Sequence, residues 1–96
     1  MKKIIVVLDN VRSVFNVGSI FRTADATQNV EIYLCGITPT PQNPKITKTS
    51  LGSEQNIKWH YFKNTLEATK KLKEKHTPIY SVELTKKSKH FQKLLI

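Results

Sequence analysis

The sequence of 96 residues contains one cysteine, three histidines and no long apolar segment. Because Cys35 has no second cysteine to pair with, an internal disulfide and a multi-thiolate metal site are excluded. The histidines share no ligand-like spacing, so we expect no metal; they are His60, His76 and His90. The apolar run at residues 4–8 is too short for a signal peptide, and no segment has the ~20 apolar residues that span a bilayer. We therefore expect a cytoplasmic protein without a membrane partner.

Acidic residues are scarce: 7 Asp and Glu stand against 16 Lys and Arg, a formal net charge of +9. Residues 1–48 contribute +3 and residues 49–96 contribute +6. This surplus favours a polyanionic partner, with nucleic acid first and an anionic membrane surface second. The alternative is a solvated lysine-rich surface, because 14 of the basic residues are lysine. The second half is suited to salt-dependent binding of a phosphate backbone through Lys70, Lys71, Lys73, Lys75, Lys86, Lys87, Lys89 and Lys93.

The apolar pattern alternates between strands and helices, which predicts an α/β fold with a parallel sheet and right-handed crossovers. Short β-branched or alternating runs predict strands at 4–8, 30–35, 57–62 and 78–84. Helical spacing and capping residues predict helices at 15–27 and 64–75, and one helical turn at 46–51 within an irregular, proline-rich stretch. One small domain, residues 1–96, accounts for the whole chain. The apolar end at 91–96 begins a further element, or frays as a helix, so the chain is expected to end in mid-fold.

The sequence also predicts the burial, capping or packing of several side chains in this fold. Cys35 follows an apolar run and is expected to be buried. The second helix begins with Asn64 as its cap, with Glu67 three residues later, as in a capping box. Its inward face is expected to carry Leu66, Thr69 and Leu72. Three aromatic residues at the third strand either pack in the core, which we favour, or offer stacking surface to nucleobases; they are Trp59, Tyr61 and Phe62.

Residues 8–26, LDNVRSVFNVGSIFRTADA, are the most informative segment. They run from a strand through a polar turn into a helix, and so place polar and cationic groups at the carboxyl end of a strand, where open α/β sheets bind ligands. Gly18 suits either the close approach of a ligand or of another backbone, or tight packing of the helix on a strand. Asn16 is suited to cap the helix. Arg22 lies off the apolar stripe and either binds a phosphate or carboxylate or is an ordinary surface arginine.

This segment resembles the first signature motif of the SpoU-type RNA 2'-O-ribose methyltransferases, within the knotted SPOUT superfamily. The matching positions are Asn10, Arg12, Asn16, Val17, Gly18, Ser19, Ile20, Arg22, Thr23 and Ala24. The resemblance implies a SPOUT-like parallel-sheet fold, S-adenosyl-L-methionine as methyl donor, tRNA or rRNA as partner, and a homodimer in the complete family form. It places Asn16 and Arg22 on the family's catalytic pair. The residues expected to reach RNA are Asn10, Arg12, Ser19 and Lys48. As turn residues, Asn10 and Arg12 either reach RNA or brace the motif.

The resemblance covers the N-terminal part of the catalytic domain. Lys48, Thr49, Gly52 and Glu54 match a Lys-Thr-x-x-Gly-x-Glu loop that follows the first motif. Residues 51–54 do not represent the Gly-x-Glu of the second motif, because no apolar strand precedes them. The second and third motifs, which supply the C-terminal knot and most of the donor pocket, are absent, so the residues that bind S-adenosylmethionine are unknown.

Two functions from different classes follow. The first is methyl transfer to a ribose 2'-oxygen of tRNA or rRNA by a SpoU-type enzyme of which this chain is a truncated form. The second is a non-catalytic RNA-binding or dimerising module that has lost the donor site. A fragment without a role of its own is the third alternative.

Overall fold

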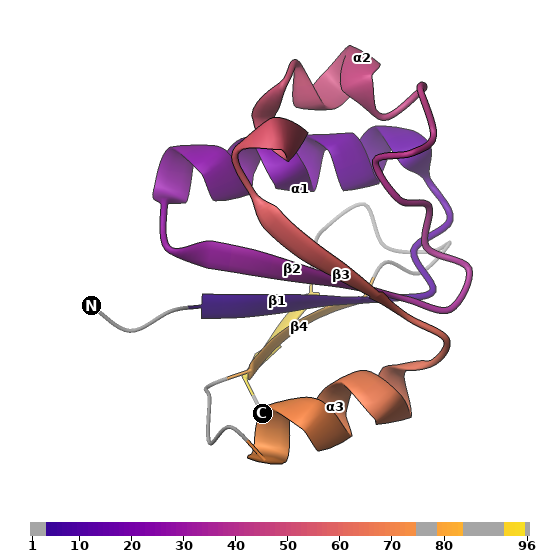
Figure 1. The fold of residues 1–96 in the computed structure, drawn as a ribbon, viewed down its shortest axis with the longest axis vertical. Helices are drawn as coiled ribbons and strands as arrows, with labels where there is room; N and C mark the ends of the chain where they lie inside the picture. Colours follow the sequence, from indigo (N-terminus) through magenta and orange to yellow (C-terminus); the bar gives the residue numbers. More distant parts are fainter. Residues whose placement is uncertain (1–3, 75–78, 84–91, 96) are drawn as a thin grey trace.

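The computed structural model describes residues 4–74, 79–83 and 92–95, which form a five-stranded sheet with helices on both faces (Figure 1). The strand order is β3-β2-β1-β4-β5. Along the chain the elements are β1 (Ile4–Asp9), α1 (Val14–Thr27), β2 (Val30–Cys35), α2 (Thr47–Ser50), the 3₁₀ turn η1 (Ser53–Gln55), β3 (Lys58–Phe62), α3 (Thr65–Glu74), β4 (Ile79–Glu83) and β5 (Gln92–Leu95). The predicted α/β class is confirmed.

The strand β1 lies at the centre of the sheet and pairs in parallel with β2 and β4. Its Ile5 is opposite Glu31 of β2 and Ile79 of β4. A run of β-branched apolar residues suits this position, because a central parallel strand is covered on both faces. The strand β3 adds in parallel to β2 at the outer edge. The apolar end of the chain forms β5, antiparallel to β4, so the alternative of a frayed helix was wrong.

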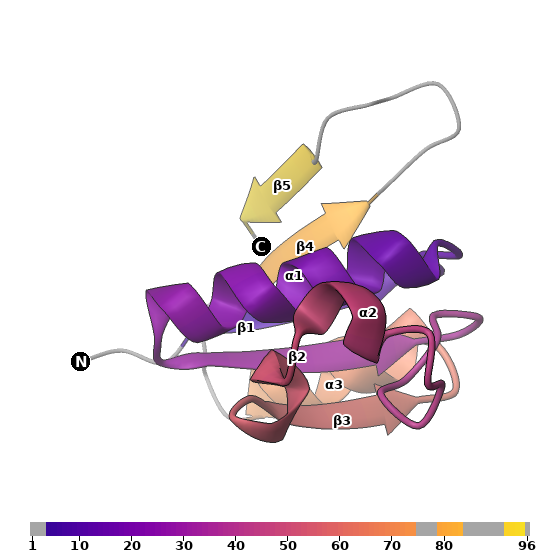
Figure 2. The same cartoon turned by 90° about the horizontal axis from the view of Figure 1, so that it is seen from above.

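Two apolar clusters hold the helices against opposite faces of the sheet. The helices α1 and α2 lie over one face and α3 lies over the other (Figures 1 and 2). The cluster under α1 is formed by Leu8, Val11, Val17, Phe21, Ala24, Ile32, Leu34, Ile46 and Ile57. The cluster under α3 is formed by Ile5, Val7, Tyr33, Cys35, Ala68 and Leu72. Each cluster draws alternate residues from β1 and β2, as expected for a sheet buried on both sides.

The helix α3 differs from its prediction on one face. Asn64 caps it as expected, with its Oδ1 accepting from the Glu67 backbone N–H at 2.9 Å. Leu66, however, is 68% exposed, whereas Ala68 and Leu72 are fully buried. The prediction of an inward Leu66 was wrong because the small Ala68 lets the helix pack closely on the sheet, and the stripe is then centred on Ala68 and Leu72.

Some predictions fall on residues that the structure does not describe. They include the charged loop at 85–90, the lysines at 75, 86, 87 and 89, and the side chain of Lys93. Among the described residues, no helix is long and apolar enough to cross a bilayer.

Candidate functional site

The carboxyl ends of β1 and β2 are joined by the buried hydroxyl of Thr38. Its Oγ1 accepts from the Val11 backbone N–H at 3.0 Å. Its one hydrogen is shared between two carbonyl oxygens, that of Cys35 at 2.8 Å and that of Leu8 at 3.1 Å. Thr38 is 3% exposed. Three backbone groups at this edge are therefore satisfied by the protein itself and are not open to a ligand.

Asn10 braces the same edge. Its Oδ1 accepts from the Ile37 backbone N–H at 3.0 Å, and its Nδ2 donates to an Asp9 carboxylate oxygen at 2.9 Å. Asn10 has a φ of 53°, a left-handed conformation that asparagine tolerates better than most residues. Gly36 has a φ of +65°, and a Cβ there would overlap Asn10 Oδ1. The amide of Asn10 thus fixes the turn after β2, and its contact with RNA stays a prediction.

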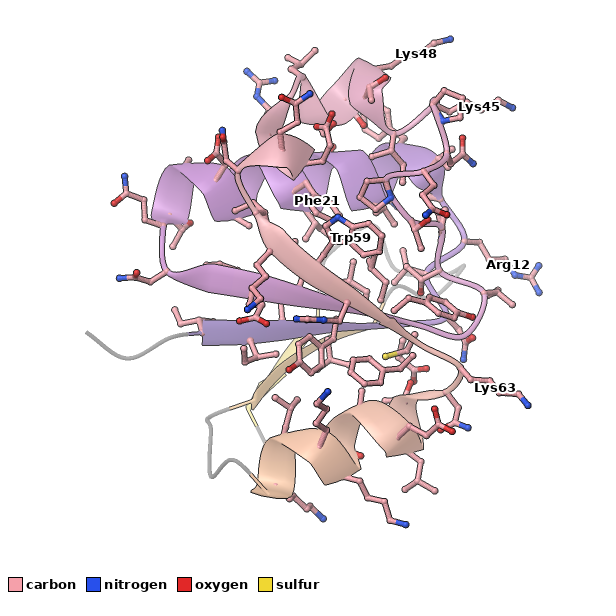
Figure 3. The ribbon with its side chains drawn as sticks, viewed as in Figure 1. Arg12, Phe21, Lys45, Lys48, Trp59 and Lys63 are labelled. Atoms are coloured by element: carbon pink, nitrogen blue, oxygen red, sulfur yellow. The ribbon has the colours of Figure 1, made fainter. Side chains whose placement is uncertain are left out.

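Arg12 lies beyond this brace in the loop between β1 and α1. Its side chain is exposed and extends outward at the carboxyl-end edge of the sheet (Figure 3). The guanidinium is accessible to a phosphate, as the prediction of RNA binding requires.

The first turn of α1 is capped by Ser13. Its Oγ accepts from the Asn16 backbone N–H at 3.1 Å, and its backbone is extended, as is usual for an N-cap. The suggestion that Asn16 caps the helix was wrong in this respect: Asn16 lies three residues inside it. Its side-chain amide forms no hydrogen bond among the described residues and is open to another partner.

Three polar side chains follow one another along α1 at intervals of three residues: Asn16, Ser19 and Arg22. Neighbours at this interval have Cβ atoms about 5–6 Å apart, so the three form a continuous polar track. Asn16 and Arg22 themselves are separated by roughly 9 Å along the helix axis, and Ser19 lies between them. Arg22 is exposed, whereas Asn16 and Ser19 are partly buried. Each three-residue step rotates by about 60°, so Asn16 and Arg22 point about 120° apart around the helix and are not brought to one point.

The helix α2 packs beside this track at Gly18. A Cβ on Gly18 would overlap Thr49 Oγ1 and lie 2.8 Å from the Ile46 carbonyl oxygen. Thr49 Oγ1 also donates to the Phe15 carbonyl oxygen at 3.2 Å. Gly18 is therefore explained by the close approach of the α2 region, through the Thr49 side chain and the Ile46 backbone, and not by packing on a strand.

The rest of the loop motif stabilises the α2 region. Ser50 Oγ donates to a Glu54 carboxylate oxygen at 2.5 Å, and Gly52 adopts a φ of +90° between α2 and η1. Lys48 is exposed on α2 and extends away from the core (Figure 3). The motif thus consists of structural residues with one cation that is free to bind.

The described acidic side chains differ from the cations near α1 and α2 in their interaction partners. Within residues 4–73, whose side chains the structure describes, Arg12, Arg22 and Lys48 form no ion pair. The described acidic groups in hydrogen bonds or ion pairs include Asp9 with Asn10 and Thr65, Asp25 with Asn56, Glu31 with His60, and Glu54 with Ser50. Because these acids have partners other than arginine or lysine, the cations near α1 and α2 remain available to a polyanion.

A comparison with protein families identifies the chain as a whole. The SpoU rRNA methylase family matches the chain over residues 3–95. The chain belongs to this family. Its first motif therefore comprises β1, the braced turn at Asn10 and Arg12, and the polar track of α1, and the predicted membership is confirmed.

A solved member of the SpoU methyltransferases has the same fold. The crystal structure of the SpoU methyltransferase AviRb from Streptomyces viridochromogenes superimposes with a TM-score of 0.69 and 24% sequence identity. The match covers 77% of this chain and 29% of the AviRb chain, so the chain spans less than a third of that protein's length. No curated protein matches the sequence.

The side chain of Cys35 in this SpoU family member is buried, as predicted. Burial is the main cause that raises the pKa of the thiol from 9.0 to about 11. The negative charge of Asp9 also raises this pKa, whereas the hydrogen bond with Thr65 lowers it. Cys35 is therefore a core residue. Within the described residues no group of three His, Cys, Asp or Glu side chains is placed to hold a metal ion.

Sequence reasoning missed Ser13 and Thr38. Ser13 precedes the apolar helical residues in the way that caps do, so this signal was present in the sequence. No local sequence pattern indicated the role of Thr38, since its hydrogen-bond partners are up to 30 residues away in the chain.

Proposed function

We propose that this chain is the N-terminal part of the catalytic domain of an RNA methyltransferase that transfers a methyl group from S-adenosylmethionine to a ribose 2'-oxygen of tRNA or rRNA. The observation that carries the proposal is the exposed, unpaired Arg22 on the polar track of α1, within the matched SpoU motif. A cytoplasmic location and a homodimeric complete form are part of the proposal.

Arg22 supplies charge and geometry in this reaction. A ribose hydroxyl is a poor nucleophile until it begins to lose its proton. Guanidinium groups stay protonated in proteins, so Arg22 is unsuited to accept that proton. It is suited to hold the neighbouring phosphate through two hydrogen bonds and to stabilise negative charge that develops on the 2'-oxygen. Asn16, with a free amide one and a half turns earlier, orients the hydroxyl or the arginine.

S-adenosylmethionine supplies the methyl group when it is bound. The described part of the sheet edge between β1 and β2 does not fit it, because Thr38 and Asn10 already occupy the polar backbone groups there. We therefore assign no residue of this chain to the donor. The role proposed for Asn16, Ser19, Arg22 and Lys48 is to bind and position RNA.

A non-catalytic RNA-binding or dimerising module is the second candidate. Phe15 favours it: this residue is 64% exposed and lies seven residues before Arg22, so both are on nearly the same side of α1. An exposed phenylalanine beside a cation suits a protein contact as well as RNA. Titration calorimetry of the complete protein with S-adenosylmethionine separates the candidates, since the module would bind RNA but not the methyl donor.

Methyl transfer by the complete protein tests the proposal. Transfer RNA and ribosomal RNA are incubated with S-adenosylmethionine carrying a labelled methyl group and then hydrolysed in alkali. A 2'-O-methyl group blocks cleavage at its own nucleotide, so the label should appear in alkali-resistant dinucleotides. Label in mononucleotides would show base methylation instead and would contradict the 2'-O assignment.

Substitution at the two arginines assigns the roles. Arg22→Lys keeps the charge but loses the planar pair of donors, and we expect kcat to fall by roughly 10²-fold or more. Arg12→Lys is the matched control and should raise KM with little change in kcat. Full activity of the Arg22→Lys protein would rule out the proposed role of Arg22.

A further inference from the structure

Tyr61 is an exposed aromatic residue whose ring is held in place. It lies on the edge strand β3, opposite Leu34 of β2, and is 50% exposed. Its hydroxyl donates to the Gly36 carbonyl oxygen at 2.7 Å. The hydrogen bond fixes the tip of the ring while a large part of the side chain stays in contact with solvent.

The turn that anchors Tyr61 is itself fixed from two sides. The Gly36 backbone N–H donates to the Phe62 carbonyl oxygen at 3.0 Å, and the next N–H, that of Ile37, donates to Asn10 Oδ1 at 3.0 Å. Ile37 is 57% exposed. A rigid half-exposed tyrosine and an exposed isoleucine therefore occupy the ends of adjacent strands, and little conformational entropy is left to lose on binding a flat ligand.

The two neighbouring aromatic residues of β3 pack against the apolar clusters instead. Trp59 is half-buried and packs with the cluster under α1, near Phe21 (Figure 3). Phe62 packs on Tyr33, with ring centroids 4.8 Å apart, in the cluster under α3. Of the three aromatic residues considered for stacking, Tyr61 is the one that offers accessible surface.

Two cations lie at the same carboxyl-end edge of the sheet as Tyr61. Lys63 follows β3 by one residue, and Arg12 follows β1 by three. Both are exposed, and both extend outward on the same side of the molecule (Figure 3). The nearest acid of β1, Asp9, is half-buried and accepts from Asn10 and Thr65. An exposed aromatic face at a sheet edge that also carries two exposed cations suits the alternation of base and phosphate in a single strand of nucleic acid.

We propose that Tyr61 stacks on one unpaired base of the RNA, with Lys63 and Arg12 binding the phosphates on either side. The inference rests on the proposed function in one respect, namely that the polyanion is RNA. An unpaired base is required because a duplex buries the faces of its bases in its own stack. Tyr61 and Lys63 belong to the edge strand and its end, so they add an RNA contact outside the SpoU motif, to which Arg12 belongs.

Binding of a fluorescent single strand to the purified chain tests the site. The probe is a single-stranded RNA of about ten nucleotides with 2-aminopurine at its centre, whose fluorescence is quenched when the base stacks on an aromatic ring. Tyr61→Phe keeps the ring and should bind within about threefold of wild type, with quenching retained. Tyr61→Leu keeps apolar bulk without an aromatic face and should bind about fivefold to 100-fold more weakly, without quenching.

Lys63→Ala measures the contribution of charge to RNA binding separately from the contribution of the Tyr61 ring. It should weaken binding and lower the slope of log Kd against log salt by about 0.7, with quenching of the bound probe retained. Circular dichroism and urea unfolding of each variant verify that the fold is intact, and the Phe and Leu variants share the loss of the hydrogen bond to Gly36.

The outcomes distinguish this inference from the proposed function. Unchanged binding and quenching in Tyr61→Leu would overturn the stacking site alone, and so would equal affinity for heparin, a polyanion without bases, or for anionic lipid vesicles. Quenching that depends on Tyr61, in a complete protein that transfers no methyl group, would support the site and overturn the methyltransferase proposal. A wild-type chain that does not bind the RNA would overturn the stacking site, whereas the methyltransferase proposal is decided by the assay on the complete protein.

Discussion

The hydroxyl of Thr49 occupies the space where a side chain on Gly18 would begin. Helices usually lose about 1 kcal/mol of stability at an interior glycine relative to alanine. In this protein the glycine allows α2 to approach α1 closely, and α2 carries Lys48 beside the polar track. The contact therefore connects helix packing with the arrangement of the candidate RNA-binding surface.

Gly18→Ala should destabilise the protein despite the better helix propensity of alanine. The added methyl group would meet Thr49 Oγ1 and the Ile46 carbonyl oxygen, and such overpacking costs about 1–3 kcal/mol. Urea unfolding measures the change. Ala26→Gly, on the exposed side of the same helix, is the matched control and should cost about 1 kcal/mol from propensity alone. A Gly18→Ala protein at least as stable as wild type would show that α2 can shift without cost.

Ser13 and Asn16 should respond in opposite ways to replacement by alanine. Ser13→Ala removes the N-cap hydrogen bond and should lower the unfolding free energy by about 1 kcal/mol. Asn16→Ala removes a side chain with no partner in the described structure, so stability should change by less than about 0.5 kcal/mol while methyl transfer falls. Chemical unfolding and the methyl-transfer assay, run on both variants, give the comparison. Equal losses of stability would mean that Asn16 has a structural role.

Thr38→Val tests the edge between β1 and β2. Valine has the same shape but leaves the Val11 backbone N–H without its acceptor, which should cost about 1–3 kcal/mol. The matched control is Thr27→Val, where the exposed hydroxyl bonds to the Thr23 carbonyl oxygen, and the change there should be within about 0.5 kcal/mol. Thermal and urea unfolding give both values. A similar cost at both positions would contradict the importance of the buried network.

Cys35 predicts a pH dependence of stability at alkaline pH. The pKa of its thiol is raised from 9.0 to about 11 by burial in the folded protein. A raised pKa stabilises the fold fully below the unfolded value, and this contribution is lost as the pH rises from 9.0 towards about 11. The difference in urea midpoint between wild type and Cys35→Ala should therefore decrease across this window. A constant difference would mean that the thiol does not titrate in this range. In the folded state a thiol reagent should react slowly at neutral pH.

Local patterns predicted most of the framework. The strand at Val30–Cys35 was predicted with its observed bounds because its run of mostly apolar residues, interrupted by Glu31, ends at a glycine. The helix α1 begins one residue before the predicted start, since its cap is Ser13. Asn64 was a correct cap prediction for the same local reason.

Features that depend on distant parts of the chain were not predictable in this way. The alternation of β3 places Tyr61 on the same face as Trp59, but its exposure follows from the position of β3 at the edge of the sheet. The three bonds of Thr38 depend on how two strand ends meet. For the candidate site, the resemblance identified Asn16, Ser19 and Arg22, while only the structure shows that they follow one another along a helix surface and that Asn10 is engaged internally.

The central position of β1 has a consequence for how the chain is made. One edge of β1 pairs with β2, which follows closely in the sequence. The other edge pairs with β4, so Ile5 meets Ile79 only after most of the chain has been synthesised. Until then the most apolar strand of the protein has an open row of backbone donors and acceptors, which favours association with other nascent chains. Chaperone binding during translation should therefore concentrate on lengths that end between β2 and β4.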